Sequence, residues 1–169
     1  MEEHKKPIVV PWDFSPVAEH ALAHAVKISR MVGSEICLLH IVDSGIKPAA
    51  EGEKRVLLQH VAEENSKKYN LSIIADIVKG SIFTAIADFV NDKDASVVVM
   101  GTHGMKGMQK LTGSWALKVI VKSKVPFIVV QDPPADQERY HNIVFPVDFR
   151  KENKEKTKMA IFMGKYFDS

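Results

Sequence analysis

Short runs of consecutive apolar residues alternate along this chain with longer segments in which apolar residues recur every three or four positions. Consecutive apolar positions are typical of parallel strands that are covered on both faces, so the short runs predict strands. The predicted strands are residues 7–12, 36–42, 71–78, 96–101 and 126–131. The periodic segments between them predict helices. This order predicts an α/β fold, an open five-stranded parallel sheet with helices on both faces.

The four helices differ in how clearly the sequence marks their ends. The second is predicted at about residues 53–69, the third at 81–91 with Ser81 as its N-cap, and the fourth at about 113–122. The first begins at Ser15 and Pro16, residue types favoured at a helix start. Its apolar face consists of Ala18, Ala21, Leu22, Ala25 and Ile28. Residues 44–53 break the periodicity and predict a mobile loop before the second helix.

A repeat divides the chain into two parts. The sequence IVFPVDF at 143–149 matches IVVPWDF at 8–14 with a constant offset of 135 residues. We therefore predict one domain over residues 1–132, a proline-containing polar linker over 133–141, and one strand and one helix of a second copy over 142–169. A single strand–helix unit cannot bury its apolar faces alone, so we expect it to pack on another surface.

Composition and charge narrow the functional classes. The chain is 46% hydrophobic and 26% charged, as is typical of globular proteins, and its net charge of +2 is too small to indicate nucleic-acid binding. No apolar run approaches the roughly 20 residues that span a bilayer. The charged N-terminus does not resemble a signal peptide, so we expect a cytoplasmic protein. Cys37 is the only cysteine, which excludes an internal disulfide and a cysteine-cluster metal site.

A glycine-rich segment follows the fourth predicted strand. Gly101, Gly104, Gly107 and Gly113 lie within it, and Ser114 follows the last of them. In an open parallel sheet, ligands bind beyond the carboxyl ends of the strands, and a glycine-rich turn before a helix lets backbone N–H groups approach phosphate. Neither the dinucleotide-binding pattern after a first strand nor a Gly-Lys-Ser/Thr sequence occurs. We therefore expect a phosphate-binding loop of another kind, or else glycines that only allow the chain to turn.

Four segments together resemble the universal stress protein family over about residues 5–132: IVVPWDFSP, LLHIVD, VVVMGTHG, and GSWALKVI followed by KVPFIVVQ. The resemblance implies a Rossmann-like, adenine-nucleotide α-hydrolase-like domain with strand order 3-2-1-4-5. It also implies a site for ATP or another adenine nucleotide, with or without Mg²⁺. By this resemblance the residues that contact phosphates and ribose are Gly101, Gly104, Gly113 and Ser114. The residues that border the nucleotide are Pro11, Asp13, Ile41, Met100, His103 and Trp115.

The sequence departs from the ATP-binding pattern of that family in two respects. Eight residues, 105–112, separate Gly104 from Gly113, where the pattern has nine. In addition, Trp12 and Trp115 are bulky residues beside ligand-bordering positions, where a tryptophan can fill the space that a nucleotide needs. Gly107 would let the shorter loop tighten and still hold a phosphate.

Several polar residues have a second interpretation. Asp13 either caps the first helix or contacts the ligand. His20 and His24 have the i, i+4 spacing of metal ligands, but they lie off the apolar face of their helix, so we expect a solvated surface and no metal. His40 is expected to pack or to form a hydrogen bond within its strand, whereas His103 is the histidine expected to have a function.

No segment combines a nucleophile, a base and an orienting group, so we expect no catalytic residue and at most weak ATP hydrolysis. The expected function is that of a nucleotide-binding regulatory or stress-response protein. The alternatives are a nucleotide-free module that dimerises and contacts partners, and a nucleotide-hydrolysing or adenylate-forming enzyme of the same fold. The apolar fifth strand, Val125–Gln131, is expected at a sheet edge. The resemblance implies a homodimer or a tandem pseudo-dimer through this strand, with no nucleic acid or membrane as partner.

Overall fold

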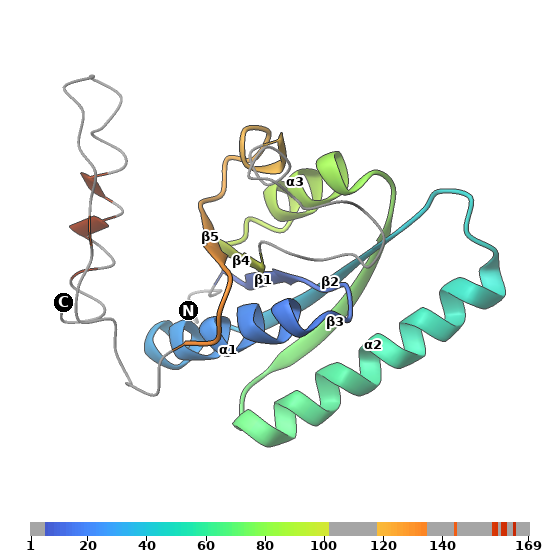
Figure 1. Cartoon of the computed structure of the whole chain (residues 1–169), viewed down its shortest axis with the longest axis horizontal. Helices are drawn as coiled ribbons and strands as arrows, with labels where there is room; N and C mark the ends of the chain where they lie inside the picture. Colours follow the sequence, from blue (N-terminus) through green and yellow to red (C-terminus); the bar gives the residue numbers. More distant parts are fainter. Residues whose placement is uncertain are drawn as a thin grey trace, which may run out of the picture. The chain divides into compact units, whose positions relative to one another are not determined.

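The computed structural model describes residues 6–101 and 118–134, together with residues 144, 157, 158, 160, 161 and 164. The chain divides into two compact units, Met1–Pro134 and Ala135–Ser169. The first unit contains every labelled element of Figure 1. In chain order these are β1 (Ile8–Pro11), α1 (Pro16–Val32), β2 (Ile36–Val42), α2 (Pro48–Tyr69), β3 (Ile73–Lys79), α3 (Ile82–Asp92), β4 (Val97–Gly101) and β5 (Phe127–Val130).

The five strands form one parallel sheet with the order β3-β2-β1-β4-β5, which confirms the predicted fold class and strand order. β1 is central, because Ile8 pairs with Ile36 of β2 on one side and with Val97 of β4 on the other. The chain adds β2 and β3 on one side of β1 and then crosses to add β4 and β5 on the other. The switch in strand order therefore lies between β1 and β4.

Helices cover both faces of the sheet, with α1 and α2 on one side and α3 on the other (Figure 1). On the α3 side, Val9, Leu39 and Val98 belong to one buried cluster with Ile86 and Val90 of α3. Successive strand residues point to opposite faces, so the intervening positions of the same strands lie under α1 and α2. Burial on both faces explains why the strands are apolar at consecutive positions.

The start of α1 agrees with its prediction in detail. Ser15 has an extended backbone and is the N-cap: its hydroxyl oxygen accepts from the Ala18 amide at 3.3 Å, and Pro16 occupies the first turn. Every residue of the predicted apolar face of α1 is buried. Ser81 likewise occupies the N-cap position of α3, but its side chain makes no capping hydrogen bond and only its carbonyl accepts from the first turn.

The second helix begins earlier than predicted. α2 starts at Pro48, so most of the segment predicted as a loop over residues 44–53 is helical. Proline is tolerated in the first turn, where its missing N–H would have no helical partner. Glu51 in that turn reaches Lys79 of β3 at 2.6 Å and Arg55 at 3.2 Å. Pro48, which the sequence pattern assigned to a loop, is therefore the first residue of the helix.

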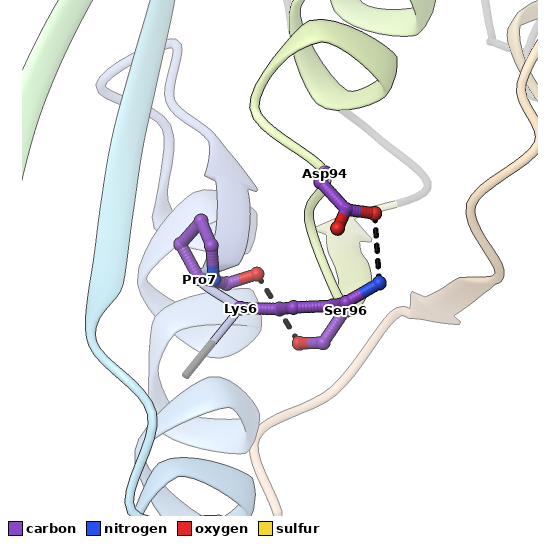
Figure 2. A network of polar contacts seen from close by, with 4 residues as sticks. All are labelled: Lys6, Pro7, Asp94 and Ser96. Atoms are coloured by element: carbon purple, nitrogen blue, oxygen red, sulfur yellow. Dashed lines mark hydrogen bonds and ion pairs between the residues drawn. The ribbon is translucent and has the colours of Figure 1, made fainter. Parts of the chain in front are cut away.

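The amino ends of β1 and β4 are joined by polar contacts (Figure 2). The carbonyl oxygen of Pro7 accepts from the Ser96 amide at 2.9 Å and from the Ser96 hydroxyl at 3.1 Å. The Lys6 ammonium lies 2.8 Å from the Asp94 carboxylate, in an exposed pair that contributes little to stability. These contacts use the polar groups at one end of the two strands, and the candidate site lies at the other end.

Candidate functional site

Asp13 lies in the turn that follows β1, where its carboxylate orders the backbone. Its Oδ1 accepts from the Ser15 amide at 3.0 Å, an Asx turn that precedes the helix cap. Ser15, and not Asp13, is the N-cap of α1, so the capping interpretation of Asp13 is wrong. Between them Phe14 adopts φ +62°, a left-handed conformation that is uncommon for a non-glycine residue. The turn therefore holds Asp13 half-buried at the carboxyl end of β1.

Met100 and Gly101 end β4, the neighbour of β1 across the switch in strand order. A Cβ atom at Gly101 would lie 2.4 Å from Cγ1 of Val17 and 3.0 Å from the Val17 carbonyl oxygen. The first turn of α1 packs directly on the Gly101 backbone, so glycine is needed there whether or not a ligand binds.

Ile41 and Met100 share one face of the sheet. Both are partly buried apolar residues that pack against the cluster between the sheet and α3. Pro11 is the last residue of β1 and lies two positions after Val9. Residues two apart in a strand share a face, so Pro11 belongs to this face as well. The structure thus brings three predicted site residues to the carboxyl edge on the α3 side, and each remains half-buried, with surface still exposed.

The other candidate residues lie outside the described part of the chain. They are His103, Gly104, Gly113, Ser114 and Trp115. Their roles in phosphate or ribose contact stay predictions.

Trp12 does not belong to the face of Ile41 and Met100. Its side chain is buried and lines a cavity between α1 and α2, on the opposite side of the sheet. The period-2 alternation of a strand places Trp12 opposite to Pro11, so its indole lies away from the face on which we expect the nucleotide.

His40 is a hydrogen-bonded strand histidine, as predicted. Its Nδ1 lies 2.6 Å from the Trp12 carbonyl oxygen and its Nε2 lies 3.0 Å from the Lys54 ammonium. A carbonyl oxygen only accepts and an ammonium only donates, so the ring is neutral with its proton on Nδ1. Burial lowers the pKa of His40, and the nearby Lys54 charge lowers it further.

His24 corrects another prediction, because it is buried and not part of a solvated surface, whereas His20 is half-buried. Nδ1 of His20 lies 3.0 Å from the Gln131 carbonyl oxygen, and Nε2 of His24 lies 3.1 Å from that of Asp132. His24 is buried, and this burial lowers its pKa. Both rings donate to the chain where it leaves β5. Within residues 6–101 and 118–134, no group of three His, Cys, Asp or Glu side chains is arranged to hold a metal ion.

The comparisons with known proteins agree with this architecture. The family model described as "Universal stress protein family" matches residues 5–131. The chain belongs to the universal stress protein family. The universal stress protein MJ0531 of Methanocaldococcus jannaschii is 29% identical over 141 residues, which cover 76% of this chain and 83% of that protein.

Solved structures of universal stress proteins share the fold. That of MJ0577, a universal stress protein of Methanocaldococcus jannaschii, has a TM-score of 0.54 and 28% identity, and the match covers 78% of this chain and 99% of that one. A universal stress protein from Archaeoglobus fulgidus, solved in complex with dAMP, has a TM-score of 0.61 at 22% identity, covering 75% and 98%. Within the described residues, no helix has the length and apolar character that crossing a bilayer requires.

Proposed function

We propose that this chain binds an adenine nucleotide, ATP or a relative of it, at the carboxyl edge between β1 and β4, and that it acts as a regulatory stress-response protein. One observation carries the proposal. The strand order switches between the neighbouring strands β1 and β4, and candidate residues from both strands meet at their carboxyl edge. Ligands of open parallel sheets bind at that place. The dAMP complex of the Archaeoglobus fulgidus protein supports the choice of ligand, because it shows that a protein of this fold binds an adenine nucleotide.

The described residues suit the two parts of a nucleoside. Ile41 and Met100 are half-buried apolar side chains on the α3 side, which offer a wall for a planar base. The Asp13 carboxylate, held by the turn, is an acceptor for ribose hydroxyls. The phosphates would be held by Gly104, Gly113 and Ser114, whose backbone N–H groups and hydroxyl are donors suited to an anion. The bound nucleotide would supply the signal, and no residue is assigned a catalytic step.

We further propose association through the segment Val125–Gln131, which contains β5, in a homodimer or in a pseudo-dimer with a second repeat. β5 is an edge strand of the sheet, and Val129 on it is 40% exposed. An exposed apolar edge strand is prone to pair with another chain. The domain limits proposed above, with a partial repeat over 142–169, fit the helical residues Thr157, Lys158, Ala160, Ile161 and Gly164.

Mass spectrometry of the denatured protein and calorimetric titration with ATP, AMP and dAMP test the nucleotide site. Asp13→Asn keeps an oxygen that can accept from the Ser15 amide but removes the charge, so it separates ligand contact from turn formation. We expect it to weaken binding about tenfold, since hydrogen bonds to charged groups contribute about 1.5–3 kcal/mol. Asp94→Asn, at the opposite end of the sheet, is the matched control and should leave affinity unchanged.

A nucleotide-free protein gives a different result. No released nucleotide, together with no thermal shift on adding Mg-ATP or AMP, would contradict the nucleotide proposal, because a ligand at 100 times its Kd stabilises by about 2.7 kcal/mol. The proposal for β5 is tested separately by sedimentation of Val129→Lys, which should yield a monomer.

A further inference from the structure

The backbone just beyond β1 is held by a histidine side chain. β1 ends at Pro11, and the Trp12 N–H still donates to the Leu39 carbonyl oxygen of β2 at 2.8 Å. The carbonyl oxygen of Trp12 accepts from Nδ1 of the His40 ring at 2.6 Å, in a buried hydrogen bond. The imidazole thereby fixes the peptide group that joins Trp12 to Asp13.

This peptide group sets the starting geometry of the turn that carries Asp13. Peptide bonds are planar, and none between the described residues is cis. The direction of the Trp12 carbonyl therefore determines the direction of the Asp13 N–H and the position of the Asp13 Cα atom. A histidine that holds this carbonyl also holds the point from which the Asp13 side chain leaves the backbone.

The next residue of the turn has an unfavourable conformation that its surroundings must maintain. Phe14 adopts φ +62°, which is a clear outlier for a bulky residue, and such conformations persist only where neighbouring contacts impose them. The Phe14 ring lies 5.0 Å from the His40 ring and 6.4 Å from the Trp12 indole, measured between ring centroids, and both contacts are edge-on. His40 thus contacts the turn twice, through Nδ1 and through the face of its ring.

The opposite side of the His40 ring is held by α2. The Lys54 ammonium donates to Nε2 at 3.0 Å, so the proton of the neutral ring stays on Nδ1, where it is donated to Trp12. Burial is the main influence on the pKa of His40 and lowers it; the Lys54 charge lowers it as well, and Asp13 raises it. The ring is therefore neutral at pH 7, in the form that donates to the Trp12 carbonyl.

We propose that His40 is a positioning residue of the nucleotide site: its Nδ1–H holds the Trp12 carbonyl, and thereby the turn that presents the Asp13 carboxylate to the ribose hydroxyls. This role rests on the proposed nucleotide function. His40 does not itself touch the ligand, because it is buried under α2, on the face of the sheet opposite to Ile41. Residues that contact a ligand act well only when such supporting hydrogen bonds fix their position.

Two amide variants separate the two hydrogen bonds of the ring. In His40→Asn the amide nitrogen takes the place of Nδ1 and can still donate to Trp12, whereas in His40→Gln the amide takes the place of Nε2 and can only serve Lys54. Calorimetric titration of the full chain with Mg-ATP should show about fivefold weaker binding for His40→Gln, and His40→Asn should retain most of the affinity. His60→Gln makes the same chemical change at an exposed position of α2 and is the control.

Dideoxy-ATP, whose ribose lacks both hydroxyls, shows whether the effect of His40 passes through Asp13. His40→Gln should bind dideoxy-ATP as tightly as the unmodified chain does. In an Asp13→Asn background, His40→Gln should cause no further loss of ATP affinity, because the two changes remove the same contact. Both amide variants lose ring packing and should be less stable in urea, so a difference in ATP affinity between them does not report on stability.

A measurement on the unmodified chain does not depend on how the variants fold. Long-range ¹H–¹⁵N spectra of the imidazole rings should show His40 as the neutral tautomer with its proton on Nδ1 at pH 7. A proton on Nε2 would overturn the proposal, because the ring would then have no donor for the Trp12 carbonyl.

The titrations also distinguish this proposal from the proposed function. If the unmodified chain binds neither nucleotide, both are contradicted. If it binds ATP but His40→Asn and His40→Gln bind equally, the nucleotide site stands and the positioning role of His40 is overturned. The same conclusion follows if His40→Gln weakens ATP and dideoxy-ATP binding to the same extent, because that result indicates a general loosening of the fold.

Discussion

The close contact between Gly101 and α1 leads to a prediction that does not depend on any ligand. In Gly101→Ala, the new methyl carbon would lie 2.4 Å from Cγ1 of Val17 and 3.0 Å from the Val17 carbonyl oxygen. The Val17 side chain can rotate, but the carbonyl belongs to the first turn of α1, so the start of the helix must move. Overpacking of this kind costs about 1–3 kcal/mol.

A smaller opposing effect arises in the unfolded chain. Replacing glycine by alanine reduces the conformational entropy of that state and stabilises the protein by about 0.4–1 kcal/mol. The net expectation is a loss of about 1–2 kcal/mol, which corresponds to a shift of about 0.5–1 M in the urea midpoint and a fall in Tm of about 3–8 °C.

Urea unfolding followed by circular dichroism measures this change, with Gly52→Ala as the matched control. Gly52 lies in α2, and a Cβ atom there would meet no atom within 4 Å, so alanine should stabilise by about 0.5–1 kcal/mol. In a Val17→Ala background, Gly101→Ala should cost less than in the unmodified chain, because the nearest clash is gone. If Gly101→Ala is as stable as the unmodified protein, the close approach of α1 to β4 is not present in solution.

Three further predictions concern α1, the buried histidines and the thiol. Ser15→Ala removes the N-cap of α1 and should cost about 1 kcal/mol in urea unfolding. The pKa values of His24 and His40 are lowered by burial, so at acidic pH the unfolded chain binds more protons than the folded one. Stability should therefore be constant above the ordinary histidine value of 6.5 and fall as the pH drops below it, which urea midpoints between pH 8 and 5 will show. Burial raises the pKa of the Cys37 thiol to about 12, so a thiol reagent should modify the native protein far more slowly than the unfolded protein at pH 8.

The sequence predicted the sheet well because burial on both faces leaves a local signal. The bounds of β2 agree with the prediction at both ends, and the capping pair Ser15 and Pro16 placed the start of α1. The start of α2 was predicted wrongly because proline and glycine are typical of loops but also occur near the start of a helix. The interpretation of His24 as a solvated residue was wrong for another reason. Its partner, Asp132, lies more than 100 residues away in the sequence, as does Gln131, the partner of His20, and no local pattern reveals such contacts.

Two of the motif residues at the carboxyl edge have structural roles that need no ligand. Gly101 allows α1 to pack on β4, and Asp13 orders the turn before Ser15. A chain of this family that binds no nucleotide would still need both residues. Their presence is therefore stronger evidence for the fold than for nucleotide binding. A substitution that tests for ligand binding must therefore leave the structural role of the residue intact. Asp13→Asn meets this condition, whereas loss of binding in Gly101→Ala would report only on the packing of α1.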